Sequence, residues 1–433
     1  DDWDWLYRAD LLTLKEQFWL VPRYPYNDRP IGALVIRVMY RIFGLNPVPF
    51  HVMCLGLHLI NMTLLLAVAR RILASWWVST AAALAFGIWS AAIGGVTWIA
   101  DIFDVLGATL VLLTTFTFLS KRAAVRASSV FFYILAARTK EATLGLPFVL
   151  LVWVLCGTWL RRVLASEPQS EPRPSGSVGR AKRSPLIDVL PHLLVALFLT
   201  IVYIPIIIQH QKNPDVTYRM EISPKTFVDG LFYYFSRLMY GGPWPIGRLI
   251  RWTIAIGALA AGVAWRPRAA LFGLAGFVIY LGPVIFMARQ RDAIYLYMPT
   301  AFLSLALGAA AEAVAARWRL RELPVAGAMA AFCLLALPHQ AHMRSKAEWM
   351  LSNTAQAGRD LTSFRSQVPA LKSGAHVRLE GFAEGYNVFR TPGCSVLKVA
   401  YHVDPVHCEF SNEGTPADVV VVRRGDGIVV SLK

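Results

Sequence analysis

The stretch VLPHLLVALFLTIVYIPIII, residues 189–208, contains no charged side chain. A helix of about 20 residues is about 30 Å long, which matches the hydrocarbon core of a bilayer. The prolines in this stretch do not exclude a membrane helix, because membrane spans tolerate proline better than soluble helices do. The stretch therefore predicts a transmembrane helix.

The composition of the whole chain indicates the same class of protein. The 433 residues are 56% hydrophobic and only 16% charged, whereas a soluble domain carries about 25% charged residues. The net charge of +16 raises the alternative of nucleic-acid binding, which requires a basic face on a folded domain. Here the basic residues lie in short runs between apolar stretches, so we expect membrane lipid and no nucleic acid as a partner.

Further apolar stretches along the chain predict an all-α polytopic membrane protein. About ten of them approach the length that a bilayer requires, and the fourth is the shortest. They lie near residues 48–69, 75–93, 103–120, 127–138, 143–160, 186–208, 249–264, 269–287, 297–316 and 323–338.

Basic clusters predict the orientation of these spans, because cytoplasmic loops are enriched in Lys and Arg. The clusters follow alternate spans. Arg outnumbers Lys and Ala is abundant, which suits a bacterium of high genomic GC, and we expect the protein in the inner membrane. A chain that begins outside would follow a span that is missing here, which gives about eleven spans in the full protein. We expect residues 1–47, 94–102, 139–142, 209–248, 288–296 and the C-terminal segment to lie outside.

Two regions are too polar to be predicted as membrane spans. Residues 161–185 are rich in Pro, Ser, Gly and charge and predict a disordered cytoplasmic linker. Residues 339–433 predict a small α+β domain on the extracytoplasmic, periplasmic side, separate from a transmembrane domain at residues 1–338. In this C-terminal domain we expect a helix near 344–366 and strands in HVRLEGF, CSVLKVAYHV, ADVVVVRR and GIVVSLK.

Cys394 and Cys408 both lie in the C-terminal domain. An oxidising compartment would allow them to form a disulfide, with Cα atoms about 5.5 Å apart. The alternative is two free, buried thiols.

The loops expected outside hold the polar residues that need an explanation. The first opens with DDWDWLYRAD, in which Trp3 and Trp5 fit an aromatic belt but the paired acids do not. Residues 31–44 predict an amphipathic interfacial helix with Arg37 and Arg41 on one side. Charges this close to hydrocarbon are costly unless they function or pair. The alternative is a set of salt bridges that hold loops together, although the gathering of acids and bases on one face favours function.

Such a set suits transfer from a lipid-linked, phosphate-activated donor. A carboxylate would take the proton of an acceptor hydroxyl, and cations would neutralise the departing phosphate.

Several stretches resemble the GT-C class of membrane glycosyltransferases, nearest to its protein O-mannosyltransferase-like, tetratricopeptide-repeat-associated branch. The matching stretches are DDW at the start, NDRP (27–30), FHVMCLGLHLINMTLLL (50–66), VTWIADIFDVLG (96–107), RTKEATLGLP (138–147) and YLYMP (295–299).

The resemblance implies an inverting glycosyltransferase that moves a sugar from a polyprenyl-phosphate donor to an unidentified acceptor on the extracytoplasmic face. It implies that Asp1 or Asp2 is the catalytic base. No cofactor is certain, although a divalent metal, Mg²⁺ or Mn²⁺, is used by some members of the wider class. The candidate substrate-binding residues are Arg29, Asp101, Asp104, Arg138, Lys140, Glu141, Arg289, Arg291, Tyr295 and Tyr297.

The sequence also departs from the pattern of that class. Gly95 stands where an acidic residue is common, Ile102 stands where Arg is usual, and the repeats are absent. His51 and His58 share one helix face, which is compatible with zinc but is better explained by helix packing. Two alternatives to the enzyme stay open, which are a lipid or glycan transporter and an inactive scaffold of the same fold.

Overall fold

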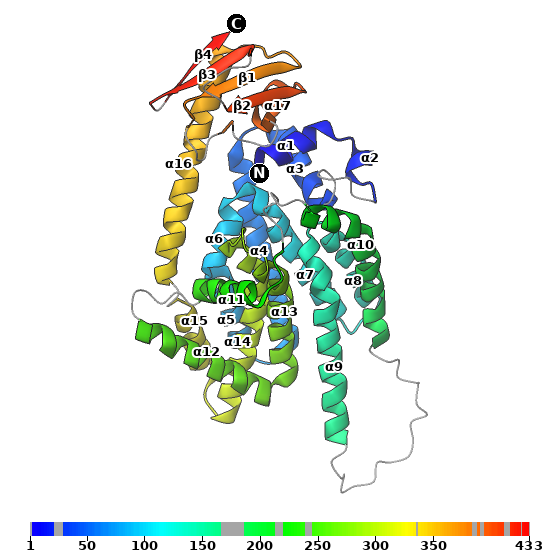
Figure 1. The fold of residues 1–433 in the computed structure, drawn as a ribbon. Coiled ribbons are helices and arrows are strands. Elements are labelled where there is room, and N and C mark those ends of the chain that lie inside the picture. The colour runs from blue at the N-terminus through cyan, green and yellow to red at the C-terminus, as the bar shows by residue number, and fades with distance from the viewer. Residues whose placement is uncertain are drawn as a thin grey trace. The chain divides into compact units, whose positions relative to one another are not determined.

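The computed structural model is mostly helical (Figure 1) and forms two compact units. Unit 1 comprises Asp1–Phe18, Ala33–Pro47 and His342–Lys433, and unit 2 comprises Trp19–Gly32 and Val48–Ala341. The structure describes residues 2–20, 29–165, 186–212, 220–238, 245–334, 337–382, 388–389, 394–410, 416–425 and 427–432. Most of the expected linker at 161–185 lies outside these residues, apart from the end of a helix that reaches Ala165.

Unit 2 is built from helices. They are α4 (Pro47–Ile72), α5 (Trp76–Ile88), α6 (Ser90–Thr97), η1 (Ile99–Asp101), α7 (Ile102–Phe118), α8 (Ala123–Ala137), η2 (Glu141–Gly145), α9 (Leu146–Ala165), α10 (Leu186–Lys212), α11 (Pro224–Leu238), α12 (Pro245–Trp265), α13 (Pro267–Ile285), η3 (Ala293–Leu296), α14 (Tyr297–Arg317) and α15 (Glu322–Leu334).

Six helical segments in the described part of the chain are long and apolar enough to cross a membrane. Their length and hydropathy indicate a multi-pass membrane protein, but the expected number of about ten spans is not confirmed. The run expected at 75–93 is divided, because Trp89 adopts an extended conformation between α5 and α6. The six segments are Pro47–Ile72, Ile99–Phe118, Glu141–Trp159, Leu186–Pro205, Pro267–Ile285 and Ala293–Arg317.

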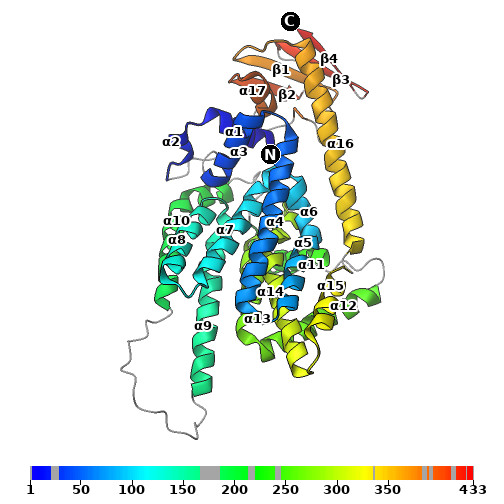
Figure 2. The same cartoon turned by 180° about the vertical axis from the view of Figure 1, so that it is seen from behind.

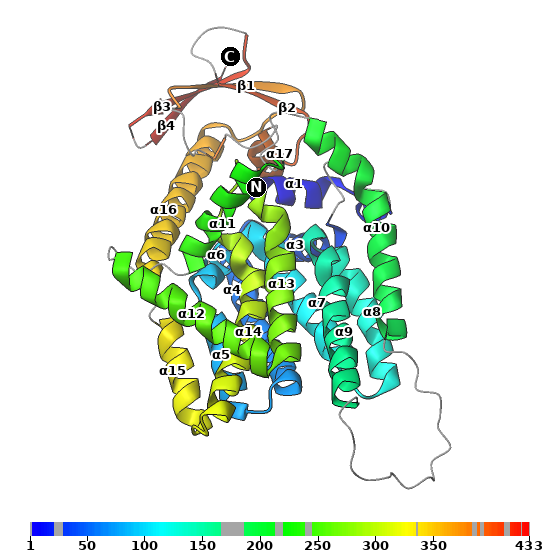
Figure 3. The ribbon, with the colours of Figure 1, turned by 60° about the horizontal axis from the view of Figure 1, so that its bottom comes forward.

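Helix α14 lies at the centre of unit 2 and is almost entirely buried. It packs against α5, α12 and α13, and Figure 3 shows α12, α13 and α14 side by side. A Cβ atom at Gly273 of α13 would lie 2.6 Å from the backbone nitrogen of Ala306. Small residues therefore allow α13 and α14 to approach closely, as is common between membrane helices. On the other side of the unit, α8 packs against α7 and α10 (Figure 2).

The basic clusters of several spans gather at one end of unit 2. A side chain on α14, Glu312, accepts a hydrogen bond of 2.6 Å from the backbone nitrogen of Ser75, which begins α5. Arg71, at the end of α4, donates to the carbonyl of Phe116 near the end of α7. The ends of α4, α7 and α14 therefore lie together.

Unit 1 contains a four-stranded sheet with the order β2-β1-β3-β4. Strand β1 is parallel to β2 and β3, with Val377 opposite Cys408 and Val419, and β4 is antiparallel to β3. The elements of the unit are α1 (Asp2–Leu11), α2 (Leu14–Gln17), α3 (Pro30–Phe43, from Ala33), α16 (Leu337–Gln367, from His342), β1 (Ala375–Glu380), α17 (Ser395–Tyr401), β2 (Val406–Phe410), β3 (Val419–Arg424) and β4 (Gly427–Leu432).

The strand predicted in CSVLKVAYHV is wrong, because this segment forms helix α17. Its buried residues Val396, Leu397 and Ala400 have helical spacing and belong to the core of the unit, so these apolar side chains enter the core from one side of the helix. Cys394 and His402 bound the helix, and both have a positive φ. Strand β2, which was not among the predicted strands, follows α17 and pairs with β1.

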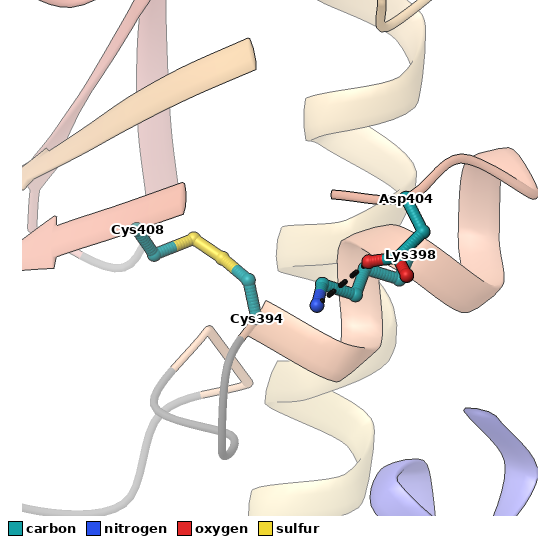
Figure 4. The surroundings of a disulfide bond; sticks show 4 residues. All are labelled: Cys394, Lys398, Asp404 and Cys408. Atoms are coloured by element: carbon teal, nitrogen blue, oxygen red, sulfur yellow. Dashed lines mark ion pairs between the residues drawn. A yellow bond between two sulfur atoms is a disulfide. The ribbon is translucent and has the colours of Figure 1, made fainter. Parts of the chain in front are cut away.

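Cys394 and Cys408 form a disulfide with their Cα atoms 5.8 Å apart (Figure 4). The expected pairing is therefore confirmed, and the alternative of two free thiols is wrong. Because Cys394 is the N-cap of α17 and Cys408 lies on β2, the bond fixes the start of this helix to the sheet.

The first helices of the chain fold into unit 1 and differ from expectation in two ways. Trp3 packs against the core of the C-terminal residues and Trp5 is buried, so these rings do not form an exposed belt. Residues 31–43 are helical as expected, but of the two arginines Arg37 and Arg41 only Arg41 is exposed. Arg37 is buried and donates to the carbonyl of Leu12, because that carbonyl, one residue past the end of α1, needs a donor.

Candidate functional site

A buried ion pair joins two of the loops that the sequence analysis singled out. Lys140 Nζ lies 2.7 Å from Asp104 Oδ2, and their side chains are 9% and 11% exposed. Asp104 occupies the first turn of α7, where a carboxylate interacts favourably with the helix dipole. Lys140 is extended and immediately precedes η2. The pair therefore fixes the beginning of α7 to the α8–η2 connection.

Asp101 lies beside this pair, at the end of η1, and is 2% exposed. Its carboxyl group interacts electrostatically with Asp104, Lys140 and Asp292. Its Oδ2 atom is buried and has no hydrogen-bond partner within the described ranges. A buried carboxyl oxygen without a hydrogen-bond partner is costly, which marks Asp101 as a candidate functional group.

The ammonium group of Lys140 keeps its charge although it is buried. Burial and the Arg29 guanidinium lower the pKa of Lys140, but the Asp104 and Glu141 carboxylates outweigh them and leave this pKa above its usual value. An ammonium has three donors, and Asp104 is the one hydrogen-bond acceptor for Lys140 Nζ in the part of the chain described. The ring of Tyr295 lies 5.9 Å away. Lys140 can therefore donate to an anion without releasing Asp104.

Arg29 and Glu141 form a second ion pair next to Lys140. Arg29 Nε and Nη2 donate to the two carboxylate oxygens of Glu141 at 2.9 and 2.7 Å, and its guanidinium lies over the ring of Phe103. A Cβ atom at Gly32 would lie 2.3 Å from that ring, so a glycine is needed for Phe103 to lie there. The two-pronged contact holds Glu141, and through it the neighbouring Lys140, in one geometry.

Arg138 is nearly buried and contacts protein groups. It donates to the carbonyls of Trp19 and Leu20 at 3.0 and 3.5 Å and to the Tyr203 hydroxyl at 3.3 Å. Its own carbonyl accepts from Ile31 at 3.3 Å. These bonds hold the segments on either side of residues 21–28 against the α8–η2 connection.

Tyr297 is fully buried, and the sequence analysis did not foresee the network that holds it. His58 Nδ1 lies 2.9 Å from the Tyr297 hydroxyl, and His58 Nε2 lies 3.2 Å from the Gly87 carbonyl. Asn61 donates to the same hydroxyl at 3.0 Å and to the Val105 carbonyl at 2.9 Å. Because the carbonyl needs a donor, His58 carries its proton on Nε2 and accepts from Tyr297 on Nδ1. His58 therefore links α4 to α5 and to the first residue of α14.

The last of these loops contributes Arg289, Arg291 and Tyr295. Arg291 Nη2 donates to the Thr226 carbonyl at 3.4 Å, while its Nε atom is buried without a hydrogen-bond partner among the residues described. Arg289 is half-exposed and lies 3.9 Å from Glu221. Asp292 begins η3 by accepting from the backbone nitrogen of Ile294, which presents Tyr295 toward Lys140.

Asp1 lies outside the described residues, and Asp2 is described only as the first residue of α1. Both acids belong to unit 1, whereas the other candidate residues belong to unit 2. No set of three or more His, Cys, Asp and Glu side chains suited to a metal ion occurs in the described ranges. These residues therefore do not fit a Mg²⁺ or Mn²⁺ site, and no step is assigned to a metal.

The departure at Gly95 has a structural counterpart. A Cβ atom at this position would lie 3.1 Å from Asp101 Oδ2 and from the rings or methyl groups of Tyr297 and Val105. A larger acidic side chain would therefore crowd Asp101. Ile102, where Arg is usual in the resembling class, is fully buried.

Comparisons with known proteins give one weak similarity. No family model and no curated protein matches the chain. Among solved structures, it is similar to the crystal structure of ArnT from Cupriavidus metallidurans bound to undecaprenyl phosphate. The sequence identity is 15% and the TM-score 0.47, over 98% of this chain and 88% of that chain. At these values the similarity decides neither fold nor function.

Proposed function

We propose that this protein is an inverting membrane glycosyltransferase that uses a polyprenyl-phosphate sugar as its donor. The observation that carries the proposal is the Lys140–Asp104 pair with Asp101 beside it, at one end of a unit built from apolar helices. The ordered resemblance of the outside loops to the GT-C class supports the same reaction. The sugar, the acceptor and the length of the lipid are left open.

In the proposed step, the acceptor oxygen bonds to the anomeric carbon while the bond from that carbon to the phosphate oxygen breaks. Asp1 or Asp2 takes the acceptor proton, and the polyprenyl phosphate leaves with growing negative charge. Lys140 donates to this phosphate through the hydrogen atoms that Asp104 does not use. Arg291, whose Nε has no hydrogen-bond partner among the residues described, is the second candidate cation.

The carboxylates near Lys140 have a different proposed role. Asp104 holds the ammonium charged and oriented, whereas Asp101 Oδ2 accepts a hydrogen bond from a hydroxyl of the sugar. Such a bond fixes the sugar ring relative to the phosphate. Arg29 and Glu141 hold the loop that carries Lys140.

We place the site on the extracytoplasmic face, with the C-terminal domain on the same side. The alternation of basic clusters supports this orientation. The disulfide between Cys394 and Cys408 supports it independently, because disulfides persist in oxidising compartments.

The proposal is tested with the full-length protein in liposomes that contain radiolabelled polyprenyl-phosphate mannose. Release of polyprenyl phosphate and transfer of label are measured, together with binding of the donor. We expect Asp1→Asn or Asp2→Asn to lower turnover about a hundredfold or more while the donor still binds. We expect Lys140→Met to lower turnover as well. The matched control is Lys121→Met, which changes an exposed lysine between α7 and α8.

Two outcomes would contradict the proposal. Movement of intact donor across the bilayer without cleavage would identify a transporter. Binding of a panel of polyprenyl-phosphate hexoses without cleavage would identify an inactive scaffold. Normal turnover in both Asp1→Asn and Asp2→Asn would move the base to another carboxylate.

A further inference from the structure

The helix that carries the candidate base folds with the C-terminal residues. Helix α1 begins at Asp2 and belongs to the same compact unit as residues 342–433. It packs against α17. Trp5 and Ala9, which have helical spacing, are both buried, and Trp3 packs against the core of the C-terminal residues. The apolar face of α1 is therefore part of this unit.

Three polar side chains fix α1 to α17. The Tyr7 hydroxyl donates to Asp404 Oδ2 at 2.9 Å, and Lys398 Nζ lies 2.9 Å from Asp404 Oδ1. The same Nζ atom lies 4.9 Å from the centre of the Tyr7 ring, so each of the three side chains contacts the other two. Figure 4 shows Lys398 of α17 reaching the carboxylate of Asp404. Each member therefore constrains the other two.

Neighbouring groups hold both partners of this contact. Arg37 is 7% exposed and donates to the carbonyl of Leu12, so a cation neutralises the C-terminal end of α1. On the other side, the disulfide fixes the N-cap of α17 to β2. The position of α1 is consequently set in part by Asp404, which lies 397 positions beyond Tyr7 along the chain.

We infer that the C-terminal domain positions the catalytic helix α1, and that Tyr7, Lys398 and Asp404 are positioning residues. The inference rests on the proposed function, since it takes Asp1 or Asp2 as the base. These three side chains act through α1 and not on the substrate. A shift of about 1 Å in a reacting group costs up to about a hundredfold in rate, so the contact governs turnover more than donor binding.

The test compares Tyr7→Phe and Asp404→Asn with Tyr401→Phe in the full-length protein in liposomes. Tyr401 is a matched control, because its hydroxyl donates to the Val368 carbonyl inside the C-terminal domain at 2.6 Å. We expect Tyr7→Phe and Asp404→Asn to lower kcat about tenfold and to leave KM for the donor within about twofold. Lys398→Met should do the same, and Lys398→Arg should restore most of the rate because it keeps the charge.

Hydrogen exchange of the α1 amides supplies a readout that does not depend on activity. We expect faster exchange in Tyr7→Phe and Asp404→Asn and none of this change in Tyr401→Phe. Unchanged exchange, or an equal loss of kcat in Tyr401→Phe, overturns the inference. A wild-type protein without transferase activity overturns the proposed function instead, and the exchange experiment still decides whether the domain holds α1.

Discussion

Lys140 and Asp104 form a nearly buried ion pair between residues 36 positions apart, with 2.7 Å between Nζ and Oδ2. A pair of this kind has two effects that must be separated. Each charge compensates the other, so that removing one partner alone is destabilising, and the pair supplies a cation that stays charged inside the protein. The proposed function depends on the second effect.

The first prediction separates these effects. Lys140→Met or Asp104→Leu alone leaves a buried charge without its partner, which should cost about 3–5 kcal/mol in the free energy of unfolding. The double variant removes both charges and should recover part of that loss, yet it should stay inactive. Thermal unfolding in detergent and release of polyprenyl phosphate measure the two quantities. A double variant that regains turnover would exclude Lys140 from the reaction.

The second prediction concerns the network around Tyr297. Tyr297→Phe leaves His58 Nδ1 and one hydrogen atom of Asn61 without their partner in a buried place, which should cost about 1–3 kcal/mol. Tyr280→Phe is the matched control, because the Tyr280 hydroxyl is buried without a hydrogen-bond partner in the described part of the chain. Its removal should be neutral or stabilising. Equal unfolding midpoints for the two variants would contradict the network.

The third prediction concerns topology. Reporter fusions after Arg71, after Arg162 and after Arg321 should report the cytoplasm, and a fusion at Lys433 should report the outside. The grouping of the ends of α4, α7 and α14 agrees with this alternation. If any of the first three reporters is active outside, the orientation is wrong.

The sequence predicted best what depends on local composition. A span is recognised because about 20 apolar residues follow one another, so the runs at 48–69 and 269–287 correspond to α4 and α13. Features that depend on distant partners were missed. The valines in 394–403 favoured a strand, but this segment forms helix α17, and its Val396 packs in the core of unit 1. Nothing in DDWDWLYRAD indicates that Tyr7 meets Asp404.

The same distinction applies to the candidate site. The residue types and their loops were predicted, and the structure brings Asp101, Asp104, Lys140 and Tyr295 together. The pairings were not predicted, because positions along the chain do not determine which of several nearby charges Lys140 meets in the fold. His58, Asn61 and Tyr297 lie in stretches that carry the family resemblance. The resemblance does not say which of these side chains form hydrogen bonds with one another.

The fourth prediction concerns the disulfide. Cys394 and Cys408 are 14 positions apart, and a loop of this size is expected to contribute about 3 kcal/mol to stability. The double variant Cys394→Ser, Cys408→Ser should therefore lower the unfolding midpoint of the C-terminal domain. It should also speed hydrogen exchange in α17, because this bond holds its N-cap. A single-variant Cys156→Ser, which changes a free thiol, is the control. Exchange in α17 that does not differ from wild type would show that the sheet holds the helix without the bond.

The last prediction concerns the pH dependence of the contact between α1 and α17. Hydrogen bonds from Lys398 and then Tyr7, together with the Lys398 charge, lower the pKa of Asp404, although its slight burial acts in the opposite direction. A carboxyl group whose pKa is lowered by folding stabilises the folded state above its unfolded pKa, near pH 4, and loses that contribution as the pH falls through the folded value.

The contact should therefore be intact at neutral pH and weaken only below about pH 4. Hydrogen exchange of the α1 amides, corrected for the intrinsic effect of pH, measures it. In Asp404→Asn no carboxyl group titrates at this position, so the exchange of α1 should be faster than in wild type and lack this step. A step of the same size in Asp404→Asn would assign it to another carboxyl group.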